Sequence, residues 1–335
     1  MISEIMLFLG GIAVFSLGLR FIGENVGKAA GDRLKTSVER ATANPFGASL
    51  LGLGATALAQ SSVAIDMAVV GLVDAGAISF LSACALIMGA NIGTTVTAQL
   101  VSFSFSSFSV TAVGSLVCFL GFIFANVKGK RRRAAGDIMI GFGLIFIGIE
   151  IMTETVNLFY DSKFFLMLFS VKSLPIMLLN GIMITAICQS SSVVSSILLI
   201  LAADGKVDFQ SAVFIMLGAN VGSCFAVINA SKNNGVYSRR VAIFNLLFNA
   251  LGALMFAAVF SVTGDFFTGL FIKGANTARA VANFHTFFNT VTAVIAFPFL
   301  KPLCRLCEFL TPETNKKRRA KRQHRAYSID NAALL

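Results

Sequence analysis

Two clusters of uncharged polar residues interrupt apolar stretches of the chain. Gln60-Ser61-Ser62 lies within about 48–73, and Gln189-Ser190-Ser191-Ser192 lies within about 174–201. Each cluster is followed by Gly-Ala-Asn-x-Gly, at Gly89–Gly93 and at Gly218–Gly222. Short hydroxyls and amides satisfy backbone groups freed by a break in a membrane helix, and glycine lets a ligand approach the main chain. Such a break offers bare N–H groups to an anion and carbonyls to a small cation.

Basic residues are nearly absent from both stretches. Phe46–Val127 contains no Lys or Arg, and Leu174–Ser231 contains only Lys206. An anion bound there would be neutralised by helix dipoles and co-bound cations, which would couple the binding of the two. Oxygen ligands suit a hard cation such as sodium. Asp66, the one carboxylate well inside a stretch, is a candidate cation or proton site, or else it faces a wet cavity.

The composition indicates which elements position these clusters. The 335 residues are 56% hydrophobic and 13% charged, with a mean hydropathy of +0.82, whereas soluble domains carry about 25% charged residues. This excludes a soluble enzyme, a disordered chain and a disulfide scaffold, and predicts an all-α polytopic membrane protein. We expect about seven crossing helices and two re-entrant hairpins at the polar clusters. The spanning runs lie at about 5–23, 76–100, 109–127, 135–153, 206–229, 241–262 and 282–300.

The chain contains an internal duplication. Thr56–Gly93 aligns with Thr185–Gly222 without a gap, with fourteen identities concentrated at polar and glycine positions. Gly18–Gly23 likewise matches Gly143–Gly148. Hydrophobic bias alone would favour Leu and Ile matches, so these segments indicate a repeated structural unit.

The distribution of charge predicts the topology. If the two polar stretches are re-entrant, the basic segments all fall on one side of the membrane, namely Lys28–Arg40, Lys128–Arg133, Lys232–Arg240 and Lys316–Arg325. The positive-inside rule then places the N-terminus outside and the C-terminus in the cytoplasm. The two units have opposite orientations, as in the inverted-topology repeats of secondary transporters. The net charge of +11 thus reflects the topology and contact of the basic segments with membrane lipid. Binding to nucleic acid is not expected.

The expected divisions of the chain follow from this topology. Residues 1–127 form the first repeat, 128–134 a cytoplasmic basic linker, 135–262 the second inverted repeat, 263–303 the final helix and 304–335 a basic cytoplasmic tail. The N-terminus lacks the features of a cleaved signal peptide. The chain stops after a short basic tail, so no further regulatory domain is expected after the last helix.

The doubled pattern resembles the signature of the type II sodium-dependent phosphate cotransporter family over about 5–300. The resemblance implies transport of inorganic phosphate with sodium. Val63 departs from the family pattern, in which a third Ser is common. The resemblance places phosphate and sodium, with individual sodium ligands unassigned, at hairpin tips formed by Gln60, Ser61, Ser62, Gln189, Ser190, Ser191 and Ser192. Neighbouring broken helices would complete the site with Asn91, Thr94, Thr95, Asn220 and Ser223.

A second internal similarity relates Asn245-Leu-Leu-Phe-Asn249 to His285-Thr-Phe-Phe-Asn289. The i,i+4 spacing places each polar pair on one helical face. Hydrogen bonding between helices explains such pairs, and the alternative is that His285 is a pH-sensitive group lining the substrate path.

These observations favour a secondary active transporter of the cell membrane (inner or plasma membrane). It would perform sodium-coupled symport of inorganic phosphate by alternating access, with sodium as coupling ion and no other cofactor. A phosphate exporter, a carrier of another oxyanion and a passive channel remain alternatives, and a homodimer is compatible with the sequence. An enzyme is not expected, because the only histidines are His285 and His324 and no nucleophile–base pair or metal cluster emerges.

Overall fold

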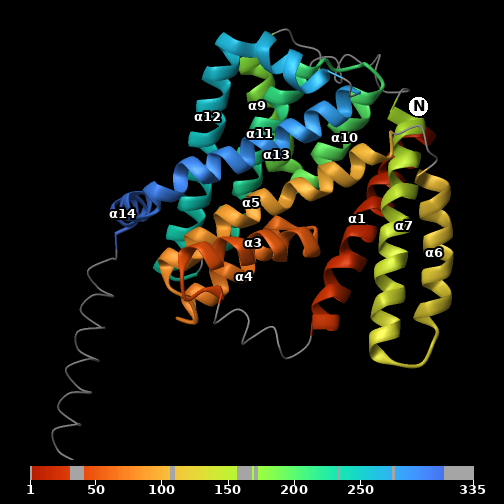
Figure 1. Ribbon diagram of the computed structural model, residues 1–335, viewed down its shortest axis with the longest axis horizontal. Coiled ribbons are helices and arrows are strands. Elements are labelled where there is room, and N and C mark those ends of the chain that lie inside the picture. The colour runs from red at the N-terminus through yellow and green to blue at the C-terminus, as the bar shows by residue number, and fades with distance from the viewer. Residues whose placement is uncertain are drawn as a thin grey trace, which may run out of the picture.

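The computed structural model describes residues 2–30, 41–105, 110–156, 168–169, 173–232, 234–273 and 276–312. All the regular elements within these ranges are helices (Figure 1), which confirms the predicted all-α class. They are α1 (Ile2–Ala30), α3 (Pro45–Ala59), α4 (Ser62–Asp74), α5 (Phe80–Phe103), α6 (Val110–Ala125), α7 (Lys130–Val156), α9 (Leu174–Cys188), α10 (Ser191–Ala203), α11 (Phe209–Ser231), α12 (Val236–Ile272), α13 (Thr277–Ala296), the 3-10 turn η1 (Phe297–Phe299) and α14 (Leu300–Leu310).

Six helical stretches of the described chain are long and apolar enough to cross a membrane. The seventh predicted crossing, at about 109–127, corresponds to α6, which has 16 residues. At 1.5 Å per residue it is about 24 Å long, short of the ~30 Å hydrocarbon core. The six stretches are Ser3–Asn25, Phe80–Phe103, Lys130–Thr155, Phe209–Ser231, Val236–Ile272 and Thr277–Leu310.

Two pairs of short helices contain the polar clusters. α3 and α9 have 15 residues each, and α4 and α10 have 13 each. The start of α3 follows from its sequence, because Asn44 accepts a hydrogen bond from the Gly47 amide and Pro45 occupies the first turn. Each short helix is about 20–22 Å long, so none can cross a membrane alone.

Glycine contacts give the relative directions of the packed helices. A Cβ on Gly11 would meet Met152, and a Cβ on Gly148 would meet Phe15, so α1 and α7 are antiparallel. Figure 1 shows α1, α6 and α7 side by side at one end of the molecule. Gly89 contacts Ser49 and Gly93 contacts Leu53, so α3 and α5 are parallel. The equivalent contacts make α9 and α11 parallel as well: Gly181 with Ile215, Gly218 with Leu178 and Gly222 with Ile182.

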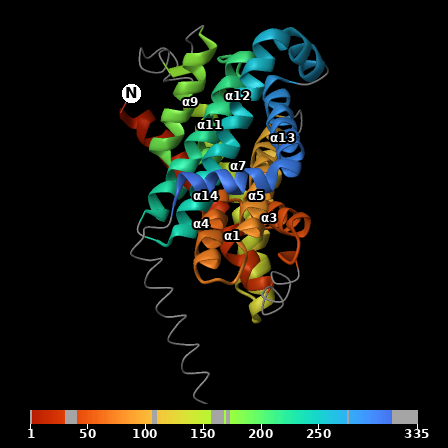
Figure 2. The same cartoon turned by 90° about the vertical axis from the view of Figure 1, so that its left-hand side faces the viewer.

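The last long stretch is interrupted at η1, which contains Pro298. Proline removes a backbone donor and breaks the helical ladder, and Figure 2 shows α14 running across the direction of α12. Residues 304–310, assigned from the sequence to the start of the tail, therefore belong to a helix. Residues 31–40 and the basic segment Lys316–Arg325 lie outside the described residues.

Candidate functional site

The two polar clusters form turns of the same geometry. Gln60 and Gln189 end α3 and α9 in the left-handed region, each with φ of 53°. The Gln60 amide donates to the Thr56 carbonyl and the Gln189 amide to the Thr185 carbonyl, both at 2.8 Å. A non-glycine residue adopts this conformation only where its surroundings enforce it. The predicted breaks at both clusters are therefore confirmed as local structure.

A serine caps the helix that leaves each turn. Ser61 Oγ accepts a hydrogen bond from the Ala64 amide at 3.3 Å, and Ser190 Oγ accepts one from the Val193 amide at 3.4 Å. The remaining first-turn amides of α4 and α10 lack intrahelical acceptors and carry the positive end of the helix dipole. Both turns thus present the groups that bind oxyanions in proteins.

One cavity of about 480 Å³ brings the two turns together. All seven polar residues predicted at the tips line it, although they come from segments more than a hundred residues apart in the chain. The rest of the wall comes mainly from α1. The lining residues are Ser16, Leu19, Arg20, Gly23, Glu24, Ala59, Gln60, Ser61, Ser62, Val63, Ala64, Gln189, Ser190, Ser191 and Ser192.

The two glutamines differ in how firmly they are held. Gln60 is 5% exposed, its Nε2 donates to the Ala57 carbonyl, and its Oε1 accepts a hydrogen bond from Thr97 Oγ1 at 2.9 Å. Gln189 is exposed, and its side chain makes no hydrogen bond within the described chain. Ala226 stands at the position of the repeat that corresponds to Thr97. The second turn therefore has an amide that is available to a bound molecule.

The Gly-Ala-Asn-x-Gly motifs lie in unbroken helices, contrary to the prediction of broken ones. α5 and α11 are continuous through the motif, and the motif glycines lie at contacts with a neighbouring helix. A Cβ on Gly93 would lie 2.5 Å from the Leu53 carbonyl oxygen, and one on Gly222 would lie 2.5 Å from the Ile182 carbonyl oxygen. These glycines therefore admit the backbone of a neighbouring helix, and not a ligand.

The asparagines of the two motifs bind the last long helices. Asn91 Nδ2 donates to Asn245 Oδ1 at 3.3 Å on α12. Asn220 Nδ2 donates to Asn289 Oδ1 at 2.9 Å, and Asn220 Oδ1 lies 3.2 Å from His285 Nε2. Asn289 and His285 are both residues of α13. The similarity between 245–249 and 285–289 thus reflects two equivalent partners, and these contacts are the interhelical hydrogen bonds expected from the sequence.

The remaining predicted hydroxyls bind carbonyls of their own helices. Thr94 donates to Ala90 at 3.0 Å, Thr95 to Ile92 at 2.8 Å and Ser223 to Asn220 at 2.7 Å. Neither these three residues nor the two motif asparagines line the cavity. The structure therefore divides the predicted site into a cavity at the tips and a separate buried network.

Asp66 belongs to the buried network. It is 4% exposed and its Oδ2 accepts a hydrogen bond from Asn245 Nδ2 at 3.0 Å, while its Oδ1 has no hydrogen-bond partner. His285 is 1% exposed and its Nδ1 is likewise unpaired. Within the described residues, no group of three His, Cys, Asp or Glu side chains could hold a metal ion.

Sequence reasoning missed the charged residues of the cavity. Arg20 and Glu24 line it from α1, which lies outside the two ranges poor in basic residues, 46–127 and 174–231. The sequence does contain a feature that singles out Arg20: in the matched runs Gly18–Gly23 and Gly143–Gly148, Arg20 aligns with the apolar Ile145. A charged residue in place of an apolar one, within an otherwise repeated helix, marks a position where the two copies differ.

Two broken polar segments of a helical, apolar chain meet in one cavity, and discontinuous helices of this kind form the binding sites of many secondary transporters. The comparisons identify the family: the chain belongs to the Na+/Pi-cotransporter family, whose sequence model matches residues 14–154 and 157–287. It is therefore a membrane protein of a phosphate transporter family.

Individual relatives cover different shares of the chain. The chain is 30% identical over 320 residues to YjbB of Escherichia coli (strain K12), named "Putative inorganic phosphate export protein", with 93% of this chain and 57% of YjbB covered. It is 27% identical to the uncharacterised YqeW of Bacillus subtilis, with 90% and 96% covered. Over 102 residues, 30% of this chain and 15% of the relative, it is 35% identical to the sodium-dependent phosphate transport protein 2A of Oryctolagus cuniculus. No solved structure matches the chain.

Proposed function

We propose that the protein is a sodium-coupled carrier of inorganic phosphate that works by alternating access. The cavity shared by the Gln60 and Gln189 turns carries this proposal. Two helix N-termini and several hydroxyls on its wall suit a tetrahedral oxyanion. The similarity to a sodium-dependent phosphate transport protein supports sodium as the coupling ion.

The proposed architecture is a pair of inverted repeats with re-entrant hairpins. The lengths of α3, α4, α9 and α10 support re-entry, because none reaches across the hydrocarbon core. The antiparallel packing of the matched helices α1 and α7 supports opposite orientation. In Figure 1, α1 ends and α7 and α12 begin toward the lower side of the view. Since α7 and α12 start with basic residues, that side would face the cytoplasm, with the N-terminus outside.

We place the phosphate site at the tips and a candidate cation or proton site at Asp66. A buried carboxylate oxygen without a partner suits a positive ion. The predicted ligands Asn91, Thr94, Thr95, Asn220 and Ser223 would reach the phosphate or sodium only in another conformation, because they lie outside the cavity in this one.

Purified protein in proteoliposomes tests the proposal. Uptake of labelled phosphate is measured with an inward sodium gradient and with potassium or choline at the same ionic strength. We expect uptake to require sodium and to be lost on Gln189→Ala, while Gln210→Ala, on α11 outside the cavity, retains it. Uptake at the same rate without sodium would exclude coupling, and conductance without saturation would indicate a channel.

Export is a second candidate, because YjbB is named for phosphate export. A carrier can run in either direction, so the imposed gradients decide the direction in vitro. Phosphate release from loaded vesicles that ignores sodium on both sides would favour an exporter of another mechanism. Competition by unlabelled sulfate and arsenate defines which oxyanions the cavity accepts.

A further inference from the structure

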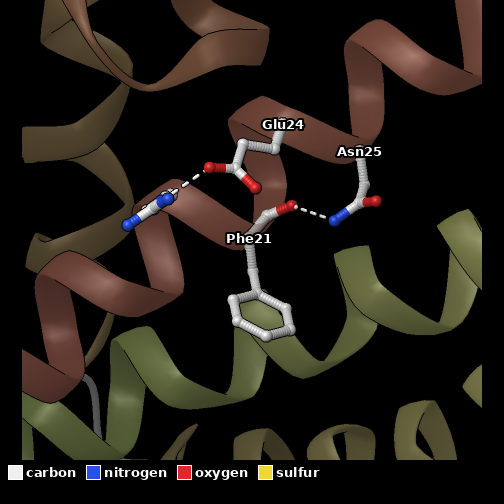
Figure 3. Close-up of polar contacts among 4 residues, drawn as sticks. Phe21, Glu24 and Asn25 are labelled. Atoms are coloured by element: carbon white, nitrogen blue, oxygen red, sulfur yellow. Dashed lines mark hydrogen bonds and ion pairs between the residues drawn. The ribbon is translucent and has the colours of Figure 1, made fainter.

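The described residues of the cavity wall include one cation and one carboxylate, and these two side chains form an ion pair. Among the lining residues that the structure describes, Arg20 is the only Lys or Arg and Glu24 is the only acidic residue. Arg20 Nε donates to Glu24 Oε1 at 2.6 Å, and this contact is the dashed line that reaches the Glu24 carboxylate in Figure 3. Neighbouring Asn25 instead donates to the Phe21 carbonyl at 2.9 Å. The charges of the described lining therefore compensate each other while this pair is intact.

The packing of α1 places this pair beside the first turn. A Cβ on Gly23 would lie 2.6 Å from the carbonyl oxygen of Ala59, the residue before Gln60. Glycine at this position thus lets the turn of α1 between Arg20 and Glu24 approach the tip closely. The apolar Ile145 in the matching run of α7 shows that the second unit has no equivalent pair.

The ion pair is poorly suited to a purely structural role. The side chains of Arg20 and Glu24 are 72% and 50% exposed, and exposed ion pairs add little to stability. Only Nε of the guanidinium is bonded to Glu24, and the described chain provides no further acceptor for Arg20. The fork of remaining N–H donors matches the geometry of two phosphate oxygens.

We infer that Arg20 contacts the bound anion and that Glu24 is its competitor in the empty cavity, so that phosphate binds by displacing Glu24 from Arg20. The inference rests on the proposed function and adds α1 to the two turns as a part of the phosphate site. Competition weakens phosphate binding, and a carrier benefits because the anion must leave as readily as it enters. Glu24 acts through Arg20 and is a positioning residue.

A double-mutant cycle on the full chain tests this inference. Half-saturation and maximal rate of labelled phosphate exchange are measured in proteoliposomes for Arg20→Gln, Glu24→Gln and the double variant, together with equilibrium binding of inorganic phosphate in detergent. We expect Arg20→Gln to raise the half-saturation concentration at least tenfold. Glu24→Gln should lower it several-fold and slow the maximal rate, because release becomes slower. Arg20→Lys should restore only part of the affinity, since it lacks the fork.

The decisive result is the double variant, in which Glu24→Gln should have no further effect once Arg20 is replaced. An equal effect of Glu24→Gln in both backgrounds would overturn the inference, because Glu24 would then act independently, for example on the cation. Unchanged half-saturation in both single variants would also overturn it. Arg305→Gln on α14 is the matched control and should behave as wild type. Wild-type protein that neither binds nor moves phosphate would refute the proposed function, and this inference with it.

Discussion

Thr97 Oγ1 donates a 2.9 Å hydrogen bond to Gln60 Oε1 and fixes the first turn to α5. The second copy of the repeat has Ala226 at this position, and Gln189 is left exposed. Two turns with the same backbone geometry therefore differ in the hydroxyl group that holds the glutamine side chain. We interpret the first turn as the fixed wall of the cavity and the second as the adaptable one.

Introducing the missing hydroxyl should reduce transport. Ala226→Thr places a hydroxyl on α11 that can form a hydrogen bond with the Gln189 side chain. Ala226→Val adds similar volume without a hydroxyl. We expect Ala226→Thr to slow phosphate exchange more than Ala226→Val does, with similar thermal stability for both. Equal rates for the two variants would show that Gln189 is not limited by its lack of a partner.

Removing the hydroxyl from the first turn should cost stability. Thr97→Val preserves shape but leaves Gln60 Oε1 buried without its donor, at an expected cost of about 1–3 kcal/mol. Thermal unfolding in detergent measures this loss. An unchanged unfolding temperature would mean that Gln60 finds another partner at the tip.

Glycines of α3 should differ sharply in their tolerance of alanine. A Cβ on Gly52 would overlap the Leu86 carbonyl of α5, whereas one on Gly54 meets nothing within 4 Å. We expect Gly52→Ala to lower the free energy of unfolding by about 1–3 kcal/mol. Gly54→Ala should be neutral or slightly stabilising because alanine favours helix. Similar unfolding curves for the two variants would contradict the close contact of α3 with α5.

Asn289 should matter more for stability than an exposed asparagine. Asn289→Ala removes the acceptor for Asn220 Nδ2 within a buried network. Interhelical hydrogen bonds in membranes average about 0.6 kcal/mol, with larger losses when a polar group is left unpaired. Asn126→Ala, at an exposed position after α6, is the control. Equal unfolding temperatures for the two variants would argue against a stabilising role for the Asn220 contact.

Asp66→Asn should change the cation dependence without disrupting the fold. The new amide oxygen can still accept the hydrogen bond from Asn245 Nδ2, while the negative charge is lost. We expect the half-saturation for sodium in phosphate uptake to rise at least tenfold. Asp265→Asn, an exposed carboxylate of α12, should leave the sodium curve unchanged. A shifted pH profile with an unaltered sodium curve would identify Asp66 as a proton site instead.

The sequence was sufficient to predict the helical class and the two breaks. Serine and glutamine in an apolar stretch are costly unless they end a helix or face a polar space, so Gln60 and Gln189 could be placed. Duplication also indicated that the two clusters act together. Their shared cavity follows from packing that the repeat implies but does not specify.

The partners of the motif residues could not be predicted in the same way. Glycine within Gly89–Gly93 is compatible with a ligand or with a neighbouring helix, and only the packed α3 decides between them. Arg20 and Glu24 lay in an apolar run whose length suggested an ordinary span. Because helical periodicity does not identify the neighbour across an interface, the contribution of α1 to the cavity became visible only in three dimensions.

The glycine contacts between α3 and α5, and between α9 and α11, show that the residues that hold the helices together differ from those that line the cavity. Gly-Ala-Asn-x-Gly maintains contacts between helices, whereas the site proposed for the solute consists of the Gln-Ser turns and α1. A descendant could thus exchange one oxyanion for another by altering Arg20, Glu24 or the serines while retaining both glycine motifs unchanged. Among such descendants, the glycine motif would reveal common ancestry, and the tip residues would reveal what is carried.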